Sequence, residues 1–188
     1  RTLQGEDVAY AAAFGYRIKL LARVAKSGNE IEVGVAPTLV PMTHMLASVN
    51  DAFNAAWVKG DMSDYTMYYG RGAGRAPTAS TVIGDIGDIA RNLAHGETRY
   101  SRAVKTYGEG RLALRPAGEI SSRFYLRFAV VDKAGAFGEI ATILGRHGVS
   151  ISAASQKDEN VRRGFVPVVV LTHEAKAAEL DAALAEIK

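Results

Sequence analysis

Residues 124–148 have the sequence FYLRFAVVDKAGAFGEIATILGRHG, and the spacing of their apolar residues changes once. From Phe124 to Val130 every second residue is strongly apolar, which predicts a strand with one face toward a core. Turn residues follow at 132–135. Beyond them the apolar residues recur at helical spacing, which predicts an amphipathic helix that ends at Gly148.

The residues after this helix predict two more strands and a second helix. Residues 149–153 alternate between apolar and polar, and the segment 164–172 is dense in Val, so both are expected to be strands. Pro167 favours a bulge or a strand end within the second of them. Apolar residues at helical spacing predict a closing helix over 177–187. The order β-α-β-β-α is that of a ferredoxin-like unit without its last strand.

In a complete unit of this kind the last strand pairs with the first. Without it, the predicted strand at 124–131 keeps a row of unpaired backbone N–H and C=O groups. Such an edge invites another chain. We therefore expect a homo-oligomer, at least a dimer.

The first half of the chain begins with an Ala-rich segment at 5–14, which predicts a helix. Alternating apolar residues then predict two strands, at 16–25 and 31–35, that form a hairpin. Pro37 and Pro41 are expected to bracket a loop. The elements predicted next are a helical turn at 44–49, strands at 52–59 and 65–69, a glycine-rich loop at 70–77, and a helix that ends at Ala94. Thr78 or Ser80 is expected to cap that last helix.

Residues 97–121 contain few apolar residues and several Gly and Arg, which favours a linker. The chain is therefore expected to have a first domain at 1–96, this linker, and a second domain at 122–188. The predicted fold class is α+β. A partial α/β domain with a mixed sheet is followed by the ferredoxin-like unit.

The composition is that of an ordinary globular protein and excludes several classes of function. Apolar residues make up 48% of the chain and charged residues 23%, and no membrane-spanning run occurs. The basic residues behind the net charge of +3 are spread out, so no nucleic-acid surface is expected. The absence of Cys excludes disulfides and fits a reducing cytosol. The chain begins at Arg1 without a leader pattern, so we expect a piece of a longer protein.

The sequence predicts no metal site. Its four His residues have no partner at the spacing of metal ligands, and they are expected to be structural or exposed. They are His44, His95, His147 and His173.

Several blocks of the first half, in order, resemble the bacterial homoserine dehydrogenase family. They are Gly15–Leu21 (GYRIKLL), Pro37–Pro41 (PTLVP) followed by His44 and Leu46-Ala47, Tyr69–Gly74 (YGRGAG), Pro77–Ser80 (PTAS) and Asp85. Residues 124–187 separately resemble an ACT domain, a module that commonly follows this catalytic domain in bacteria. The resemblance covers residues 6–94 well and the predicted linker poorly.

This resemblance implies an activity for a longer parent protein. Members of the family use NAD(P) to interconvert L-aspartate 4-semialdehyde and L-homoserine, on the route to threonine and methionine. In the family the nucleotide-binding domain and the catalytic Lys and Asp lie upstream of the block that matches Gly15–Leu21. By resemblance, this chain is therefore expected to hold no catalytic residue, to bind no cofactor alone and to be inactive alone. A cytoplasmic location is expected for the parent.

The glycine-rich loop is the first candidate site. Glycines let the backbone approach a ligand closely, and the helix predicted after the loop offers free N–H groups to negative charge. The resemblance implies that Gly72 and Gly74 lie near the cofactor. The alternative interpretation is a tight strand-to-helix turn without a ligand.

The turn at 132–137 is the second candidate site. In ACT domains such a turn holds a free amino acid, with a helix N-terminus facing its carboxylate. Threonine is the expected effector. The expected contacts are Asp132, Gly135, Ala136, Phe137 and Ser152, with Ser150 as a further candidate.

This turn departs from the family's usual Asp-Lys-Pro-Gly-Val-Leu. Ala134 stands in place of the Pro, and Ala136-Phe137 stands in place of Val-Leu. Two alternatives therefore stay open. One is an ACT domain that only mediates assembly, and the other is a non-enzymatic amino-acid sensor.

Overall fold

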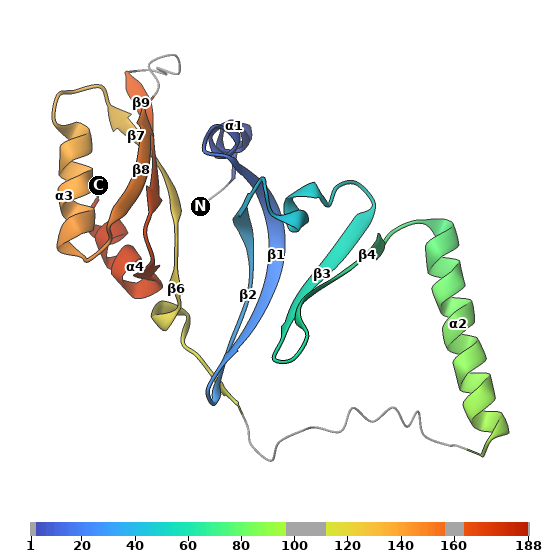
Figure 1. Ribbon diagram of the computed structural model, residues 1–188. Helices are drawn as coiled ribbons and strands as arrows, with labels where there is room; N and C mark the ends of the chain where they lie inside the picture. The colour runs from blue at the N-terminus through green and yellow to red at the C-terminus, as the bar shows by residue number, and fades with distance from the viewer. Residues whose placement is uncertain (1–2, 97–111, 157–163, 188) are drawn as a thin grey trace. The chain divides into compact units, whose positions relative to one another are not determined.

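The computed structural model describes residues 3–96, 112–156 and 164–187, and it divides into two compact units (Figure 1). One unit holds residues 1–39 and 112–188, and the other holds residues 40–111. This division differs from the predicted domain order, because the start of the chain and its last third belong to the same unit.

The first unit begins with α1 (Gly5–Ala13), followed by the hairpin of β1 (Tyr16–Ser27) and β2 (Glu30–Pro41). Strand β5 (Ala113–Leu114) pairs with β2 in parallel, which makes a sheet of order β1-β2-β5. Only two residues connect β1 to β2, and so short a connection joins antiparallel strands. Because β5 is parallel to β2, the sheet is mixed. Arg115 holds β5 in place, since its Nε donates to Glu30 at 2.9 Å.

The structure therefore places regular elements within the predicted linker. Besides β5, residues 117–119 form the short helix η2 (Ala117–Glu119), and β6 (Ser121–Ser122) pairs with β10 (Ala175–Lys176). Residues 97–111 lie outside the described residues. The domain boundaries at 96 and 122 stay a prediction.

The loop predicted between Pro37 and Pro41 is wrong, because β2 continues to Pro41. Proline lacks the N–H of a sheet hydrogen bond and is tolerated where a strand has a free side. Strand β5 pairs only with Glu30 and Ile31, so within the described residues the rest of β2 has a neighbour on one side alone.

The last third of the chain confirms the predicted β-α-β-β-α order. Its elements are β7 (Tyr125–Val131), α3 (Ala136–Arg146), β8 (Ile151–Gln156), β9 (Phe165–Thr172) and α4 (Ala177–Glu186). The sheet order is β7-β9-β8, and both pairings are antiparallel. Strand β7 is therefore an outer strand among the described residues, as predicted.

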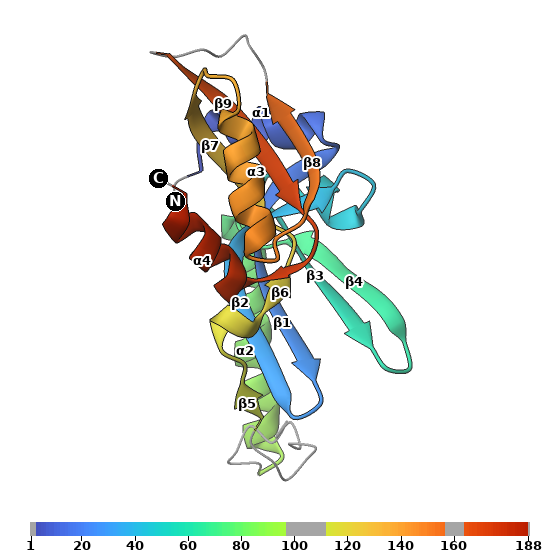
Figure 2. The same ribbon diagram turned by 90° about the vertical axis from the view of Figure 1, so that its left-hand side faces the viewer.

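The core of this part lies between the sheet and its two helices. Helices α3 and α4 cover one face of the sheet (Figures 1 and 2). The buried cluster on that face contains Ile140, Ile143, Leu144, Val149, Val168, Val170, Ala175, Leu180 and Ala183. At the ends of α3 and α4, His147 Nε2 lies 2.8 Å from Glu186 Oε2, so this His has a structural role. The Glu186 carboxylate has a lowered pKa, chiefly because of that hydrogen bond.

Pro167 lies inside β9, opposite Ala129 of β7, and not at a bulge or a strand end as predicted. The Thr172 N–H donates to the carbonyl of Phe124, so it points toward β7. The backbone N–H groups of successive strand residues point alternately to the two neighbouring strands. The nitrogen of Pro167 therefore faces the β8 side, where the described ladder ends at Gln156 opposite Val168. The register shift lies instead in β8, between Ile151 and Ala153.

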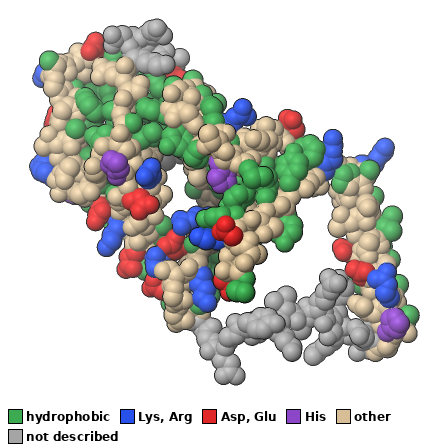
Figure 3. All heavy atoms as spheres, viewed as in Figure 1, with side chains coloured by type: hydrophobic (Ala, Val, Ile, Leu, Met, Phe, Trp, Pro, Cys, Tyr) green, Lys and Arg blue, Asp and Glu red, His purple; other side chains and the backbone are tan. Residues whose placement is uncertain are grey.

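The second unit consists of the short helix η1 (Met45–Ser48), the hairpin of β3 (Phe53–Gly60) and β4 (Asp64–Arg71), and α2 (Arg75–Ala94). The predicted helical turn and hairpin are confirmed. His44 caps η1, because its Nδ1 accepts from the N–H of Leu46 at 3.2 Å. Its ring also packs on Trp57 of β3, with ring centroids 4.8 Å apart. Figure 3 shows hydrophobic side chains gathered at the surface over this hairpin.

The predicted cap of α2 is wrong. The helix begins at Arg75, directly after Gly74, and neither Thr78 nor Ser80 caps it. Pro77 is compatible with this earlier start because it stands in the first turn, where backbone N–H groups have no partner within the helix. The predicted end is confirmed, since His95 is the C-cap and Gly96 has a positive φ of 74°.

Candidate functional site

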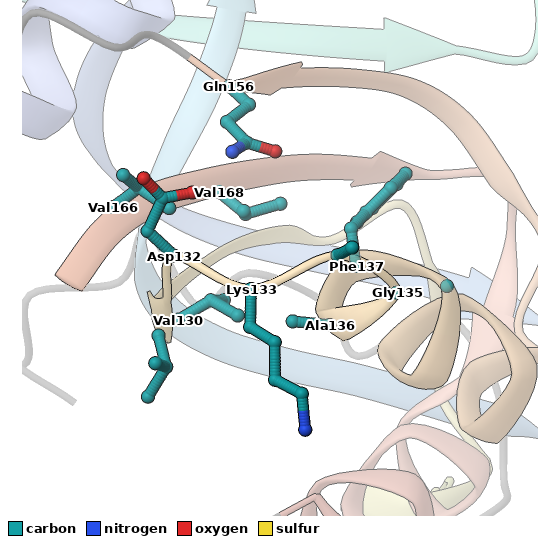
Figure 4. A pocket seen from close by; sticks show the side chains of 12 residues that line it. Val130, Asp132, Lys133, Gly135, Ala136, Phe137, Gln156, Val166 and Val168 are labelled. Atoms are coloured by element: carbon teal, nitrogen blue, oxygen red, sulfur yellow. The ribbon is translucent and has the colours of Figure 1, made fainter. Parts of the chain in front are cut away.

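A hollow of about 400 Å³ lies at the turn between β7 and α3, within the first unit. Figure 4 shows it from close by. Its lining comes from the end of β7, the turn, the first residues of α3, and strands β8 and β9. The lining residues include Val130, Asp132, Lys133, Gly135, Phe137, Gln156, Val166 and Val168.

The turn has its shape because Gly135 adopts a left-handed conformation, with φ at 88°. That region is open to glycine and costs other residues roughly 1–2 kcal/mol. Gly135 is also the N-cap of α3, and no side chain of the described residues caps this helix end. Ala136 donates to the carbonyl of Lys133 at 3.2 Å. The next N–H groups, of Phe137 and Gly138, have no partner within the helix.

The hollow combines this helix end with both signs of charge and an apolar wall. Asp132 and Lys133 are both exposed, and Gln156 contributes an amide. In Figure 4 the Gln156 amide and the Phe137 ring point toward the same space, and the Lys133 side chain extends away from it. Val130, Val166 and Val168 supply apolar surface. A small zwitterion with a short apolar side chain has complementary chemistry.

The structure brings together four of the five predicted contacts. Asp132, Gly135, Ala136 and Phe137 all line the hollow. Ser152 does not line it, because its hydroxyl donates to the carbonyl of Leu171 at 3.1 Å beside the register shift in β8. Ser150 is not a lining residue either.

Sequence reasoning missed Lys133 and Gln156 as lining residues. Lys133 stands inside the predicted turn, so its position between predicted contacts was enough to predict it as a lining residue. Gln156 gave no signal, because it reaches the hollow only through the antiparallel pairing of β8 with β9.

The glycine-rich loop of the second unit is exposed, but its backbone makes two close approaches, at Gly72 and at Gly74. The Gly72 N–H donates to the carbonyl of Ala52 at 3.0 Å, and a Cβ at Gly72 would overlap the side chain of Asn54. Gly74 has φ at 130° and is the N-cap of α2. Both glycines are therefore explained by local structure, as in the alternative interpretation. Their position near a cofactor stays a prediction.

We expect Gly72→Ala to destabilise the second unit by about 0.5–1.5 kcal/mol, because the added methyl group pushes the exposed Asn54 side chain out of its rotamer. The obstacle is one side chain, so Asn54→Ala should remove most of the penalty in the double variant. Thermal unfolding of the four proteins of this cycle measures the interaction. An equal cost of Gly72→Ala with and without Asn54 would show that the backbone, and not Asn54, excludes a side chain.

A second polar cluster, not predicted from the sequence, lies between α1 and β7 in the first unit. The Asp7 carboxylate is 3% exposed and accepts hydrogen bonds from Arg127 Nε, from Tyr125 Oη and from the Gln4 N–H, each at 2.7 Å. Arg127 Nη2 also donates to Gln4 Oε1 at 2.9 Å. The cluster connects residues about 120 positions apart in sequence, so the periodicity of apolar residues could not predict it.

The hydrogen bonds decide the protonation of this cluster. Burial opposes the charge on Asp7, but the hydrogen bonds from Arg127, Gln4 and Tyr125 outweigh it and hold the pKa of the carboxyl below its usual value. Burial and the bond to Asp7 raise the pKa of Tyr125. Asp7 is thus an anion paired with the Arg127 cation.

Among the described residues there is no group of His, Asp and Glu that could hold a metal ion. No described helix is long and apolar enough to cross a membrane.

The comparisons with known proteins agree with both halves of the chain. Residues 1–86 match the family model for homoserine dehydrogenase, and residues 124–188 match the ACT domain model. The chain corresponds to a C-terminal portion of a homoserine dehydrogenase, with part of the catalytic domain and an ACT domain.

Individual homoserine dehydrogenases match almost the whole chain. The protein of Neisseria gonorrhoeae is 39% identical over 189 residues, which cover 99% of this chain and 43% of that protein. The protein of Pseudomonas aeruginosa is 35% identical and also covers 99% of the chain. The crystal structure of the enzyme from Thiobacillus denitrificans has a TM-score of 0.83 at 35% identity, over 98% of this chain and 42% of that one. The chain thus spans less than half the length of these homoserine dehydrogenases.

Proposed function

We propose that this chain is the regulatory end of an NAD(P)-dependent homoserine dehydrogenase, and that the hollow at the β7–α3 turn binds a free amino acid. The parent enzyme would interconvert L-aspartate 4-semialdehyde and L-homoserine in the cytoplasm. The observation that carries the proposal is the hollow itself. It lies in the segment that matches the ACT domain, at the turn that the sequence pointed to.

The geometry supports an amino acid in particular. The first-turn N–H groups of α3 and the positive end of the helix dipole suit a carboxylate. Asp132 and the Gln156 amide oxygen can accept from an ammonium group. The valines of β7 and β9 suit a small apolar side chain, and threonine offers one methyl group and one hydroxyl. The volume exceeds what one such molecule needs.

The proposal divides the tasks of the parent enzyme between its parts. NAD(P) and the catalytic Lys and Asp would belong to the part that precedes the segment matching residues 1–86. We propose that this chain alone does not turn over homoserine. We also propose a ferredoxin-like arrangement for the ACT domain.

Calorimetric titration of the 188-residue chain with threonine tests the proposed site. Threonine should bind, and serine should bind about fourfold more weakly, since it lacks one methyl group worth about 0.8 kcal/mol when buried. Isoleucine and methionine test whether a longer apolar side chain is preferred. No heat from any of the four would leave the ACT domain with an assembly role only, which is the second candidate function.

We expect the chain to form at least a homodimer. Among the described residues, the outer edge of β7 has no neighbouring strand, which supports this expectation. The exposure of large apolar residues on the β1–β2 hairpin, such as Leu20, Val24 and Val35, supports it as well. The mass measured by light scattering at micromolar concentration should be twice that of the chain or more. A stable monomer under those conditions would contradict the expectation.

A further inference from the structure

Strand β7 connects the hollow to helix α1. Its successive side chains point to opposite faces of the sheet. Leu126, Phe128 and Val130 pack against the core beneath α3 and α4, and Val130 also lines the hollow. Tyr125 and Arg127 point to the other face and bind Asp7 of α1. Figures 1 and 2 show α1 on the face opposite to α3.

The two contacts are close along the strand. Arg127 precedes Val130 by three residues, which is about 10 Å of extended chain. As an outer strand, β7 has one neighbouring strand within the described residues, which is β9. It can therefore shift more easily than β9, which has a neighbour on each side.

The contact with α1 is sensitive to such a shift. The Asp7 carboxylate is almost completely buried, and the Arg127 guanidinium bonds both Asp7 and Gln4. Hydrogen bonds weaken steeply with distance and angle, and a buried charge that loses its partner is costly. A displacement of β7 by about an ångström would thus act directly on α1. Helix α1 belongs to the segment that matches the catalytic domain.

From this arrangement we infer that Arg127 couples occupancy of the hollow to helix α1, as a positioning residue that releases Asp7 when an amino acid binds. The inference rests on the proposed function of the hollow. A ligand on the helix side of the sheet draws the end of β7 toward itself. Since α1 lies on the opposite face, the same movement carries Arg127 away from Asp7.

The coupling has a thermodynamic consequence. If binding weakens the Arg127–Asp7 contact, then removal of that contact must strengthen binding by the same factor. Coupling between two sites is commonly about fivefold or more. Arg127→Met should therefore bind threonine about fivefold more tightly than the unaltered chain. Tyr125→Phe keeps the ion pair and should retain most of the coupling.

Hydrogen exchange measured by mass spectrometry on the 188-residue chain, with and without saturating threonine, tests the inference. In the unaltered chain, threonine should speed exchange of the backbone amides of residues 5–13. In Arg127→Met these amides should exchange fast already and not respond to threonine. Arg146→Met is the matched control, because Arg146 is exposed and pairs with Glu186 on the other face of the sheet. It should behave like the unaltered chain.

The outcomes separate the two proposals. If calorimetry shows threonine binding but the exchange of residues 5–13 does not change, the coupling is wrong and the site stands. If the unaltered chain binds no threonine, the site fails and the coupling fails with it. Asp7→Asn guards against unfolding of the Arg127 variant, because it removes the charge and keeps the side-chain shape. This variant should also bind threonine more tightly, and an unchanged affinity in both variants would overturn the inference.

Discussion

Replacement of Leu144 by alanine is expected to lower the free energy of unfolding of the first unit by about 2–5 kcal/mol. Leu144 is 0% exposed and belongs to the buried cluster between α3, α4 and the sheet. Its removal loses the transfer free energy of the side chain and leaves a cavity that the tightly packed neighbours fill only in part. Much of the stability of a small unit rests on such residues.

The matched control is Leu114→Ala in the same unit. Leu114 is 68% exposed on β5, outside the β1–β2 hairpin whose apolar residues are expected at a subunit interface, so the same chemical change should alter the stability by no more than about 0.5 kcal/mol. Urea unfolding followed by circular dichroism compares the two variants through their midpoints. If both variants lose the same stability, then Leu114 is buried in solution and its side chain is not a valid exposed control. If neither loses stability, the core between α3, α4 and the sheet is wrong.

Replacement of Gly135 by alanine is expected to weaken threonine binding at least tenfold, which corresponds to about 1.4 kcal/mol. The added methyl group strains the left-handed turn and stands at the lining of the hollow. It therefore disturbs the N-terminus of α3, where the carboxylate of an amino acid is proposed to bind.

Gly148→Ala is the control for strain alone. Gly148 follows the other end of α3 with φ at 77°, close to the 88° of Gly135, but it does not line the hollow. Both variants should lose a similar amount of stability, and only Gly135→Ala should lose affinity. Calorimetric titration of both with threonine makes the comparison. Equal affinities in the two variants would place the binding site elsewhere.

Much of the fold followed from local patterns. The periodicity of residues 124–148 predicted β7 and α3 closely, and the β-α-β-β-α order of the last third is confirmed. Errors arose where a local rule for proline or for a helix cap did not hold. Pro37 and Pro167 lie within strands, at positions where one side of the strand has no described neighbour. Helix α2 starts before its expected cap because a first turn accepts Pro77.

The candidate site divides in the same way. The turn at Asp132–Phe137 was predictable from the sequence. A glycine between a strand and a helix favours a left-handed residue and a helix N-terminus that no side chain caps. Gln156 was not predictable, because strand pairing alone brings it to that turn. Ser152 was predicted as a contact and instead bonds Leu171, because the register shift in β8 decides what its hydroxyl meets.

By itself, the sequence determined the elements, the family and the turn where a small molecule is proposed to bind, because these depend on residues that are neighbours along the chain. The tertiary structure alone decided which distant residues meet. It placed Asp7 against Arg127 and joined α1 to the sheet that forms the hollow. The physical reason is that a buried carboxylate is costly without a cation beside it, and the packing of sheets and helices decides which cation that is. The spacing of residues along the sequence does not identify this partner.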